Sequence, residues 1–143
     1  MTPDEAEAIL ALADEVAAGV ELAADEAVFR ADWRIHYAAE RVVERVFQAA
    51  RDLSEELQER YFGGDAFRAL RGMRNRLAHN YLDIDADILW ESVSDDLPAV
   101  RQRLAADTLE ARALIDRLLA EQVVDPGDWD RDHLGAVAPP DPE

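Results

Sequence analysis

Residues 65–81 read DAFRALRGMRNRLAHNY, and this stretch decides how the rest of the chain is interpreted. Phe67, Leu70 and Leu77 recur at the spacing of one face of a helix. Arg74 occupies the slot of that apolar stripe between Leu70 and Leu77. Because a buried guanidinium without a partner is costly, Arg74 is expected to meet a carboxylate, lie in an interface, or open onto a pocket for an anion.

The same segment differs in charge from the rest of the protein. The 143-residue chain carries a net charge of −17, and all fifteen of its basic residues are arginine. Residues 63–81 contain four arginines and one acid, Asp65, which gives this segment +3 and leaves −20 for the other 124 positions. The four arginines are Arg68, Arg71, Arg74 and Arg76. A polyanion would be repelled by most of this protein, so any contact with one is expected here.

Helical patterns lie on both sides of this segment. Thr2-Pro3 predicts the start of a first helix that ends past Gly19. From about Asp25 the spacing predicts one longer helix with a packing seam, and Gly63-Gly64 ends it, with Asp65 as a cap for the next helix. The seam residues are Ile35, Ala39, Val42, Val46, Ala49, Leu53 and Leu57.

The C-terminal half continues the helical pattern. Asp83 or Asp85 is expected to cap a helix through Ile88, Leu89 and Trp90, and residues 94–98 indicate a restart or kink. The core face predicted for the last long helix comprises Leu97, Val100, Leu104, Ala111, Ile115 and Leu118. Beyond residue 121 the chain is acidic and rich in proline. We therefore expect one all-α domain over residues 1–121 and a flexible tail over residues 122–143.

Several classes of protein are disfavoured by composition. The chain has no cysteine, which excludes disulfides, thiol nucleophiles and cysteine metal sites. Its three histidines, His36, His79 and His133, are far apart in sequence and match no metal-binding spacing, so no metal site or other cofactor is expected. No long apolar run or secretory signal is evident, and we expect a cytoplasmic protein with no membrane partner.

Asn75 and His79 are the polar residues placed to act together. Four residues apart, they lie about 40° apart around a helix, whereas Arg74 and His79 lie about 140° apart. Arg74 and His79 converge only if the helix ends before His79, or if a second copy brings its own pair alongside. Taken alone, His79 is more typical of a cation at a helix C-terminus, and Tyr81 of an aromatic plug in a core.

The run RGMRNRLAHNYLDID at 71–85, followed by ILWESV at 88–93 and DDLP at 95–98, resembles the HepT family of HEPN domains. The family signature is an arginine, a polar residue, three further residues, a histidine, any residue and a tyrosine, written R-x-x-x-x-H-x-Y. Arg74, Asn75, His79 and Tyr81 fill these positions. The resemblance implies an all-α, HEPN-type bundle of four to five helices.

The resemblance also implies a function. HepT-like proteins are toxins of type VII HEPN/MNT toxin–antitoxin systems, acting as metal-independent endoribonucleases with a cleft at a homodimer interface. By this resemblance Arg74 and His79 are the catalytic pair that promotes attack by the RNA 2′-hydroxyl, with Asn75 in support. Arg68, Arg71 and Arg76 are the expected RNA-binding residues.

The partner implied by the resemblance is a cognate minimal nucleotidyltransferase antitoxin, which silences some such toxins by attaching AMP to the motif tyrosine, here Tyr81. Two other readings compete with a toxin. One is a non-catalytic HEPN module that binds nucleotide or a partner protein, which the net charge of −17 favours. The other is a structural helical dimer in which Arg74 and His79 only make interface contacts.

Overall fold

The protein is all helical. A computed structural model describes residues 1–78 and 85–122, and within them contains six α-helices, one π turn and no strand. This confirms the all-α fold class. The elements are α1 (Pro3–Leu22), α2 (Glu26–Ala31), α3 (Trp33–Arg51), α4 (Glu55–Ala78), α5 (Ala86–Glu91), η1 (Ser92–Asp96) and α6 (Leu97–Glu121). The predicted tail beyond Gln122 lies outside the described residues.

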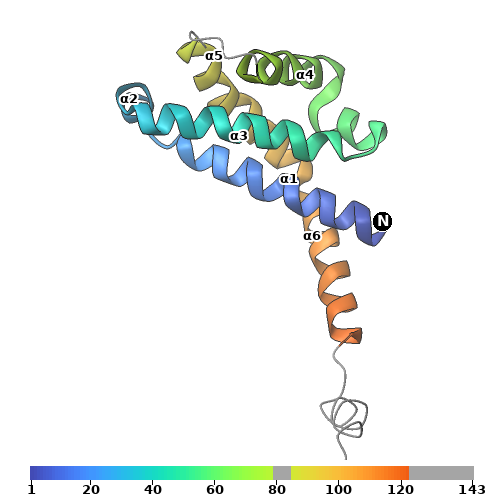
Figure 1. Cartoon of the computed structure of the whole chain (residues 1–143). Coiled ribbons are helices and arrows are strands. Elements are labelled where there is room, and N and C mark those ends of the chain that lie inside the picture. Colours follow the sequence, from blue (N-terminus) through green and yellow to red (C-terminus); the bar gives the residue numbers. More distant parts are fainter. Residues whose placement is uncertain (79–84, 123–143) are drawn as a thin grey trace, which may run out of the picture.

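The centre of the bundle is α1, which packs against both α3 and α6. α1 and α3 run side by side in opposite directions, α6 crosses behind them, and the second half of α4 lies across α3 (Figure 1). The largest fully buried side chains come from all of these helices and from α2, α5 and η1. They are Tyr61, Phe29, Ile9, Leu12, Leu89, Leu104, Val16, Val43, Val46 and Val93.

Side-chain caps begin most of these helices. The Thr2 hydroxyl accepts a hydrogen bond from the Glu5 amide at 3.1 Å, and the Glu5 carboxylate accepts one from the Thr2 amide at 2.9 Å. This reciprocal capping box, with Pro3 in the first turn, confirms the predicted start of α1. Asp85 caps α5 by accepting from the Asp87 amide at 2.9 Å, as one of the two expected residues.

The single long helix expected from Asp25 was wrong, because the chain leaves helical geometry twice. Asp32 is extended, with φ −101° and ψ 106°, and its carboxylate caps α3 through the Arg34 amide. Ser54 likewise accepts a hydrogen bond from the Leu57 amide at 3.3 Å at the start of α4. Short polar side chains that bond nearby amides favour helix starts over helix interiors. The seam residues still face the core, fully or in part.

The predicted break at Gly63-Gly64 is confirmed at Gly63. Its φ of 70° and ψ of 158° interrupt α4 and divide it into two halves that run in different directions (Figure 1). Only glycine adopts this left-handed φ without strain. Asp65 does not act as the expected cap, because its carboxylate is fully exposed and bonds no backbone amide of the described residues. Gly63 itself already redirects the chain.

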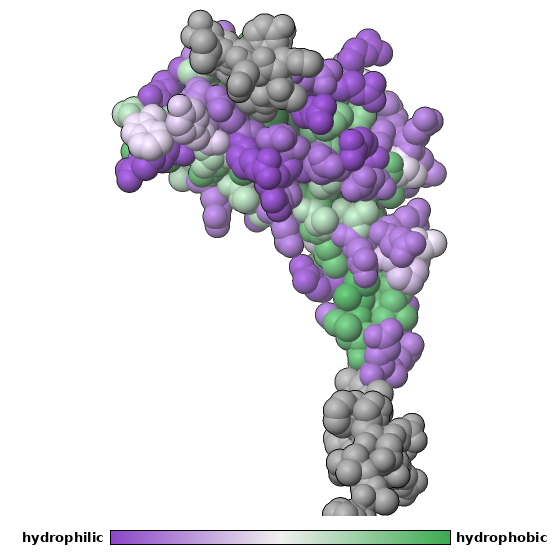
Figure 2. Space-filling view, viewed as in Figure 1, coloured by the Kyte–Doolittle hydropathy of each residue, from purple (hydrophilic) through white to green (hydrophobic). Residues whose placement is uncertain are grey.

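The restart expected at residues 94–98 is a π turn. α5, η1 and α6 follow one another directly, with no side-chain cap at the start of α6. Val93 and Leu97 remain buried through this turn, as do Val100, Leu104 and Ala111 farther along α6. The end of α6 extends past the bundle (Figure 1), and apolar surface gathers there (Figure 2). None of the described helices combines the length and apolar character needed to cross a membrane.

Candidate functional site

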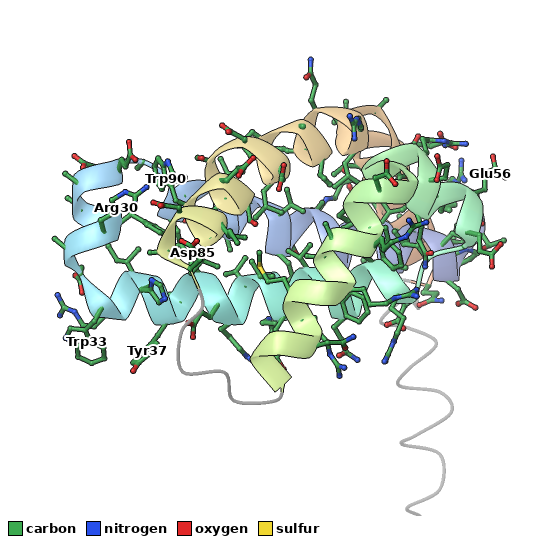
Figure 3. The ribbon with its side chains drawn as sticks, turned by 90° about the horizontal axis from the view of Figure 1, so that it is seen from above. Arg30, Trp33, Tyr37, Glu56, Asp85 and Trp90 are labelled. Atoms are coloured by element: carbon green, nitrogen blue, oxygen red, sulfur yellow. The ribbon has the colours of Figure 1, made fainter. Side chains whose placement is uncertain are left out.

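The basic segment found in the sequence forms the second half of α4, which crosses over α3 (Figure 3). Arg74 is half-buried there, and the carbon at the centre of its guanidinium lies 5.7 Å from the centroid of the Phe47 ring. Phe47 comes from α3 and is only 6% exposed. This distance is within the range of a cation–π contact.

The unusual position of Arg74 in an apolar stripe is thereby explained. Of the partners expected from the sequence, no carboxylate of the described residues lies within 4.0 Å of its guanidinium. Its Nη1 donates a long hydrogen bond of 3.4 Å to the Asn75 side-chain oxygen. The partner of the guanidinium is instead the face of an aromatic ring on α3, which sequence spacing did not identify.

Arg71 repeats this arrangement one turn earlier. Its guanidinium carbon lies 5.4 Å from the centroid of Phe67. Phe67 is stacked on Phe47, with ring centroids 5.8 Å apart and planes inclined by 21°, and the edge of Phe62 meets Phe67 at 5.9 Å. Three phenylalanines from α3 and both halves of α4 therefore form one aromatic cluster, and the two stacked rings, Phe47 and Phe67, lie beneath the two arginines.

The remaining predicted residues of α4 are less constrained. Arg68 is 83% exposed, and the nearest carboxylate recorded for it, that of Asp65, is 4.0 Å away. Asn75 is exposed next to Arg74. The side chain of Arg76 lies outside what the structure describes, although its backbone belongs to α4. Exposed guanidinium groups on one helix are suitable for contacts with phosphates.

The second half of the predicted motif falls on residues 79–84, which lie outside the described residues. The described part of α4 ends at Ala78, immediately before His79. The roles expected of His79 and Tyr81 therefore remain predictions. Whether Arg74 and His79 converge through an early helix end or through a second copy of the chain also remains a prediction.

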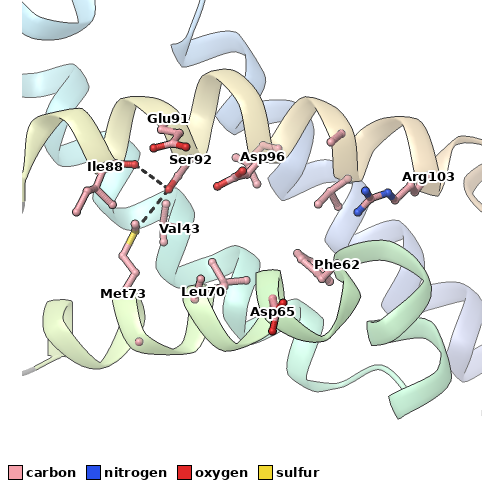
Figure 4. Close-up of a pocket in the computed structure, with 15 residues that line it drawn as sticks. Val43, Phe62, Asp65, Leu70, Met73, Ile88, Glu91, Ser92, Asp96 and Arg103 are labelled. Atoms are coloured by element: carbon pink, nitrogen blue, oxygen red, sulfur yellow. Dashed lines mark hydrogen bonds between the residues drawn. The ribbon is translucent and has the colours of Figure 1, made fainter.

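A groove of about 630 Å³ lies between the second half of α4 and the α5–η1–α6 segment (Figure 4). Leu70, Met73 and Val43 contribute apolar side chains to its lining. Ser92 crosses it, donating one hydrogen bond to the Ile88 carbonyl at 2.9 Å and making a 3.9 Å contact with the Met73 sulfur. Sequence reasoning missed this groove, because its residues come from three separate stretches of the chain.

The opposite wall of the groove is acidic. Glu91 and Asp96 line it, with Arg103 farther along (Figure 4). Partial burial, with smaller contributions from Glu91 and Asp95, raises the pKa of Asp96 above its ordinary value. Within the described parts of the chain, no group of three histidine or acidic side chains is arranged to hold a metal ion. His36 lies 3.1 Å from the Glu40 carboxylate on α3.

Comparison with known proteins identifies the family of this helical chain. A family model described as ribonuclease HepT-like matches residues 7–106, from α1 into α6, including Phe47 and Arg74. The chain belongs to the HepT-like family. This confirms the resemblance found in the sequence and accounts for the observed bundle as one of the HEPN type.

Two relatives of this HepT-like chain carry ribonuclease names. A Methanocaldococcus jannaschii protein provisionally named an RNase is 31% identical over 70 residues, which cover 49% of this chain and 63% of that protein. A Thermococcus cleftensis protein provisionally named ribonuclease HepT is 26% identical over 73 residues, covering 51% of this chain and 66% of the relative. The chain thus spans less than two thirds of these relatives. No solved structure matches it.

Proposed function

We propose that this HepT-like protein is a metal-independent endoribonuclease and the toxin of a type VII HEPN/MNT toxin–antitoxin system. The observation that supports this best is the state of Arg74, the first residue of the motif. Its side chain rests on Phe47, and no carboxylate of the described residues neutralises it. A guanidinium held in this way keeps its charge and its N–H donors available for a phosphate.

The proposed reaction is an internal transfer of phosphate. The RNA 2′-oxygen forms a bond to the adjacent phosphorus, the bond from phosphorus to the 5′-oxygen breaks, and the products are a 2′,3′-cyclic phosphate and a free 5′-hydroxyl. His79 takes the proton of the 2′-hydroxyl or returns one to the leaving 5′-oxygen, because imidazole exchanges protons near neutral pH. Arg74 stabilises the negative charge that gathers on the phosphate oxygens in the transition state.

A homodimer is part of this proposal. On one regular helix Arg74 and His79 point about 140° apart, so two copies offer a way to bring an arginine and a histidine to one phosphate. Asn75 supports His79 or bonds a phosphate oxygen. Arg68, Arg71 and Arg76 bind neighbouring phosphates, and pairing two basic helices offsets the repulsion from a chain of net charge −17.

Regulation is proposed to act on Tyr81. A cognate minimal nucleotidyltransferase antitoxin would attach AMP to this residue, two positions from His79. The added phosphate is negatively charged and bulky, and so would repel RNA and obstruct the catalytic residues.

The alternative function is a non-catalytic HEPN module that binds nucleotide or a partner protein. Two observations favour it: the net charge of −17, which disfavours RNA, and the groove of about 630 Å³ beside α4, which is large enough for a small ligand. Inactivity of the folded protein on RNA would favour this reading over the toxin.

The deciding experiment is induction of the wild-type chain in a host, alongside Arg74→Ala and His79→Ala. We expect growth arrest, and RNA fragments that carry 2′,3′-cyclic phosphate ends, with the wild type and with His36→Ala but with neither motif variant. His36→Ala is the matched control, because His36 lies on α3 and is not in the motif. Unchanged growth and intact RNA with well-expressed, folded wild type would reject the toxin, and arrest that persists in His79→Ala would reject the proposed mechanism.

A further inference from the structure

We infer that Phe47 is the positioning residue of Arg74, and that the Phe47–Phe67 stack is what aims the arginines of α4 at RNA phosphates. This inference rests on the proposed ribonuclease function and adds to it the group that orients Arg74. Phe47 does not touch the substrate. It acts through the guanidinium, whose central carbon lies 5.7 Å from its ring centroid.

The ring of Phe47 is held firmly enough to serve as a support. It is 6% exposed on α3, and Phe67 of α4 stacks on it with planes inclined by only 21°. Phe62, on the other side of the Gly63 break, meets Phe67 edge-on. Packing on several sides restricts a ring to one rotamer, so the surface under Arg74 is fixed relative to the bundle.

Arg71 and Arg74 differ in their partners from the described arginines that form ion pairs. Arg30, Arg34, Arg45 and Arg60 all bond carboxylates at ordinary ion-pair distances. Arg71 and Arg74 lie over aromatic rings instead, and neither has a carboxylate within 4.0 Å among the described residues. The lack of a carboxylate alone does not distinguish these two residues, because Arg101 and Arg112 on α6 also have none within 4.0 Å among the described residues. The aromatic ring beneath each guanidinium distinguishes Arg71 and Arg74.

This division has a physical consequence. A carboxylate fixes a guanidinium by occupying its N–H donors and cancelling its charge. An aromatic face fixes the same group by contact with its flat side and leaves the donors at its edge free. Phe47 can therefore hold Arg74 in place and leave it able to bind an anion, which an acidic side chain cannot do.

The test replaces the aromatic ring of Phe47 with an aliphatic side chain of similar size. Phe47→Leu removes the aromatic face and Phe47→Tyr restores it. Phe29→Leu is the matched control, because Phe29 is also buried and no arginine of the described residues lies over its ring. We expect Phe47→Leu to lower kcat for RNA cleavage about tenfold and to raise KM about two- to threefold, because Arg74 contacts the phosphate in the bound state and acts mainly on the transition state. Phe47→Tyr and Phe29→Leu should stay within about threefold of the wild type.

A second measurement does not depend on cleavage. Ring currents should shift the NMR signals of the Arg74 side chain upfield in the wild type and in Phe47→Tyr, but not in Phe47→Leu. Phe47→Met replaces Phe47→Leu if the leucine variant fails to fold. Binding of an uncleavable 2′-O-methyl oligoribonucleotide is measured in parallel, and should weaken with loss of the ring.

These readouts separate the two claims. If the wild type does not cleave RNA, but the Arg74 signals and oligoribonucleotide binding follow the ring, the positioning role is supported and the proposed catalysis fails. Wild-type cleavage that Phe47→Leu leaves unchanged would overturn the positioning role and leave the ribonuclease intact. The absence of a ring-current shift of the Arg74 signals in the wild type would also overturn the positioning role of Phe47.

Discussion

The hydroxyl of Tyr61 donates a hydrogen bond to the carboxylate of Asp107, joining the first half of α4 to α6. Arg60 bonds the same carboxylate at 3.1 Å, and Arg103 donates to the Tyr61 carbonyl at 3.0 Å. Burial of the ring, reinforced by Asp107, raises the pKa of the Tyr61 hydroxyl above its ordinary value. This cluster anchors the chain just before Gly63 redirects it.

Tyr61→Phe is expected to lower the free energy of unfolding by about 1.5–3 kcal/mol, the usual range for a bond to a charged acceptor. Urea unfolding at neutral pH measures it. Tyr37→Phe is the control, because Tyr37 is 62% exposed, and its stability should match the wild type. An unchanged unfolding midpoint in Tyr61→Phe would show that the bond contributes nothing.

The raised pKa of Tyr61 also predicts a loss of stability at alkaline pH. The folded state holds this proton more tightly than the unfolded chain, so the stabilisation is complete below about pH 10 and is lost as pH rises towards the folded pKa. The wild type should therefore lose stability above about pH 10 more steeply than Tyr61→Phe. Parallel slopes for the two proteins would contradict this.

Two glycine-to-alanine substitutions should change stability in opposite directions. A methyl group at Gly19 would lie 2.3 Å from the Leu97 side chain and 2.9 Å from that of Val42, where α1, α3 and α6 meet. Gly19→Ala should cost about 1–3 kcal/mol through overpacking. A methyl group at Gly72 meets none of the described residues within 4 Å, so Gly72→Ala should stabilise by about 0.5–1 kcal/mol through helix propensity. Thermal unfolding compares the two variants directly.

Arg68→Ala should weaken RNA binding without affecting the chemical step. Its guanidinium is 83% exposed, so its proposed contact is electrostatic, and we expect KM to rise about two- to fivefold at low salt with kcat unchanged. Arg112→Ala, an exposed arginine on α6, is the control and should change neither constant. A kcat loss in Arg68→Ala would instead place this residue at the reacting phosphate.

Asp96→Asn should stabilise the protein slightly at neutral pH. Because partial burial and the nearby acids raise the pKa of Asp96, the folded state disfavours its ionised form. The gain from asparagine should be present above the folded pKa and vanish as pH falls towards the unfolded value of about 4. Chemical unfolding at pH 7 and pH 4 tests this, and an equal difference at both pH values would exclude Asp96 as its cause.

Arg74 shows what residue spacing can and cannot predict about the surroundings of a side chain. An arginine in an apolar stripe predicts that its guanidinium has a partner, and the structure shows that this partner is the ring of Phe47. Spacing cannot identify this partner, because Phe47 lies on another helix and belongs to none of the predicted seam positions. The division at Asp32 was missed for a related reason: aspartate fits an exposed helix position as well as a cap, and packing decides between them.

The caps that were predicted correctly depend on local chemistry alone. Thr2-Pro3 begins α1 and Asp85 caps α5 through bonds within a few residues of the chain. The groove beside α4 depends on how three separate stretches pack, which no local pattern encodes. His79 and Tyr81 remain assigned by their place in the motif.

The π turn at Ser92–Asp96 is a position where the chain can lose one residue without disturbing the helices on either side. A π turn accommodates one residue more than regular helix does, so a deletion within Ser92–Asp96 would leave the faces of α5 and α6 in register. A deletion in the part of α6 before Ala111 would rotate every later side chain of the helix by about 100° and carry Ala111 out of the core. Single-residue gaps between this protein and its relatives are therefore expected at this turn, and not in the helix that follows it.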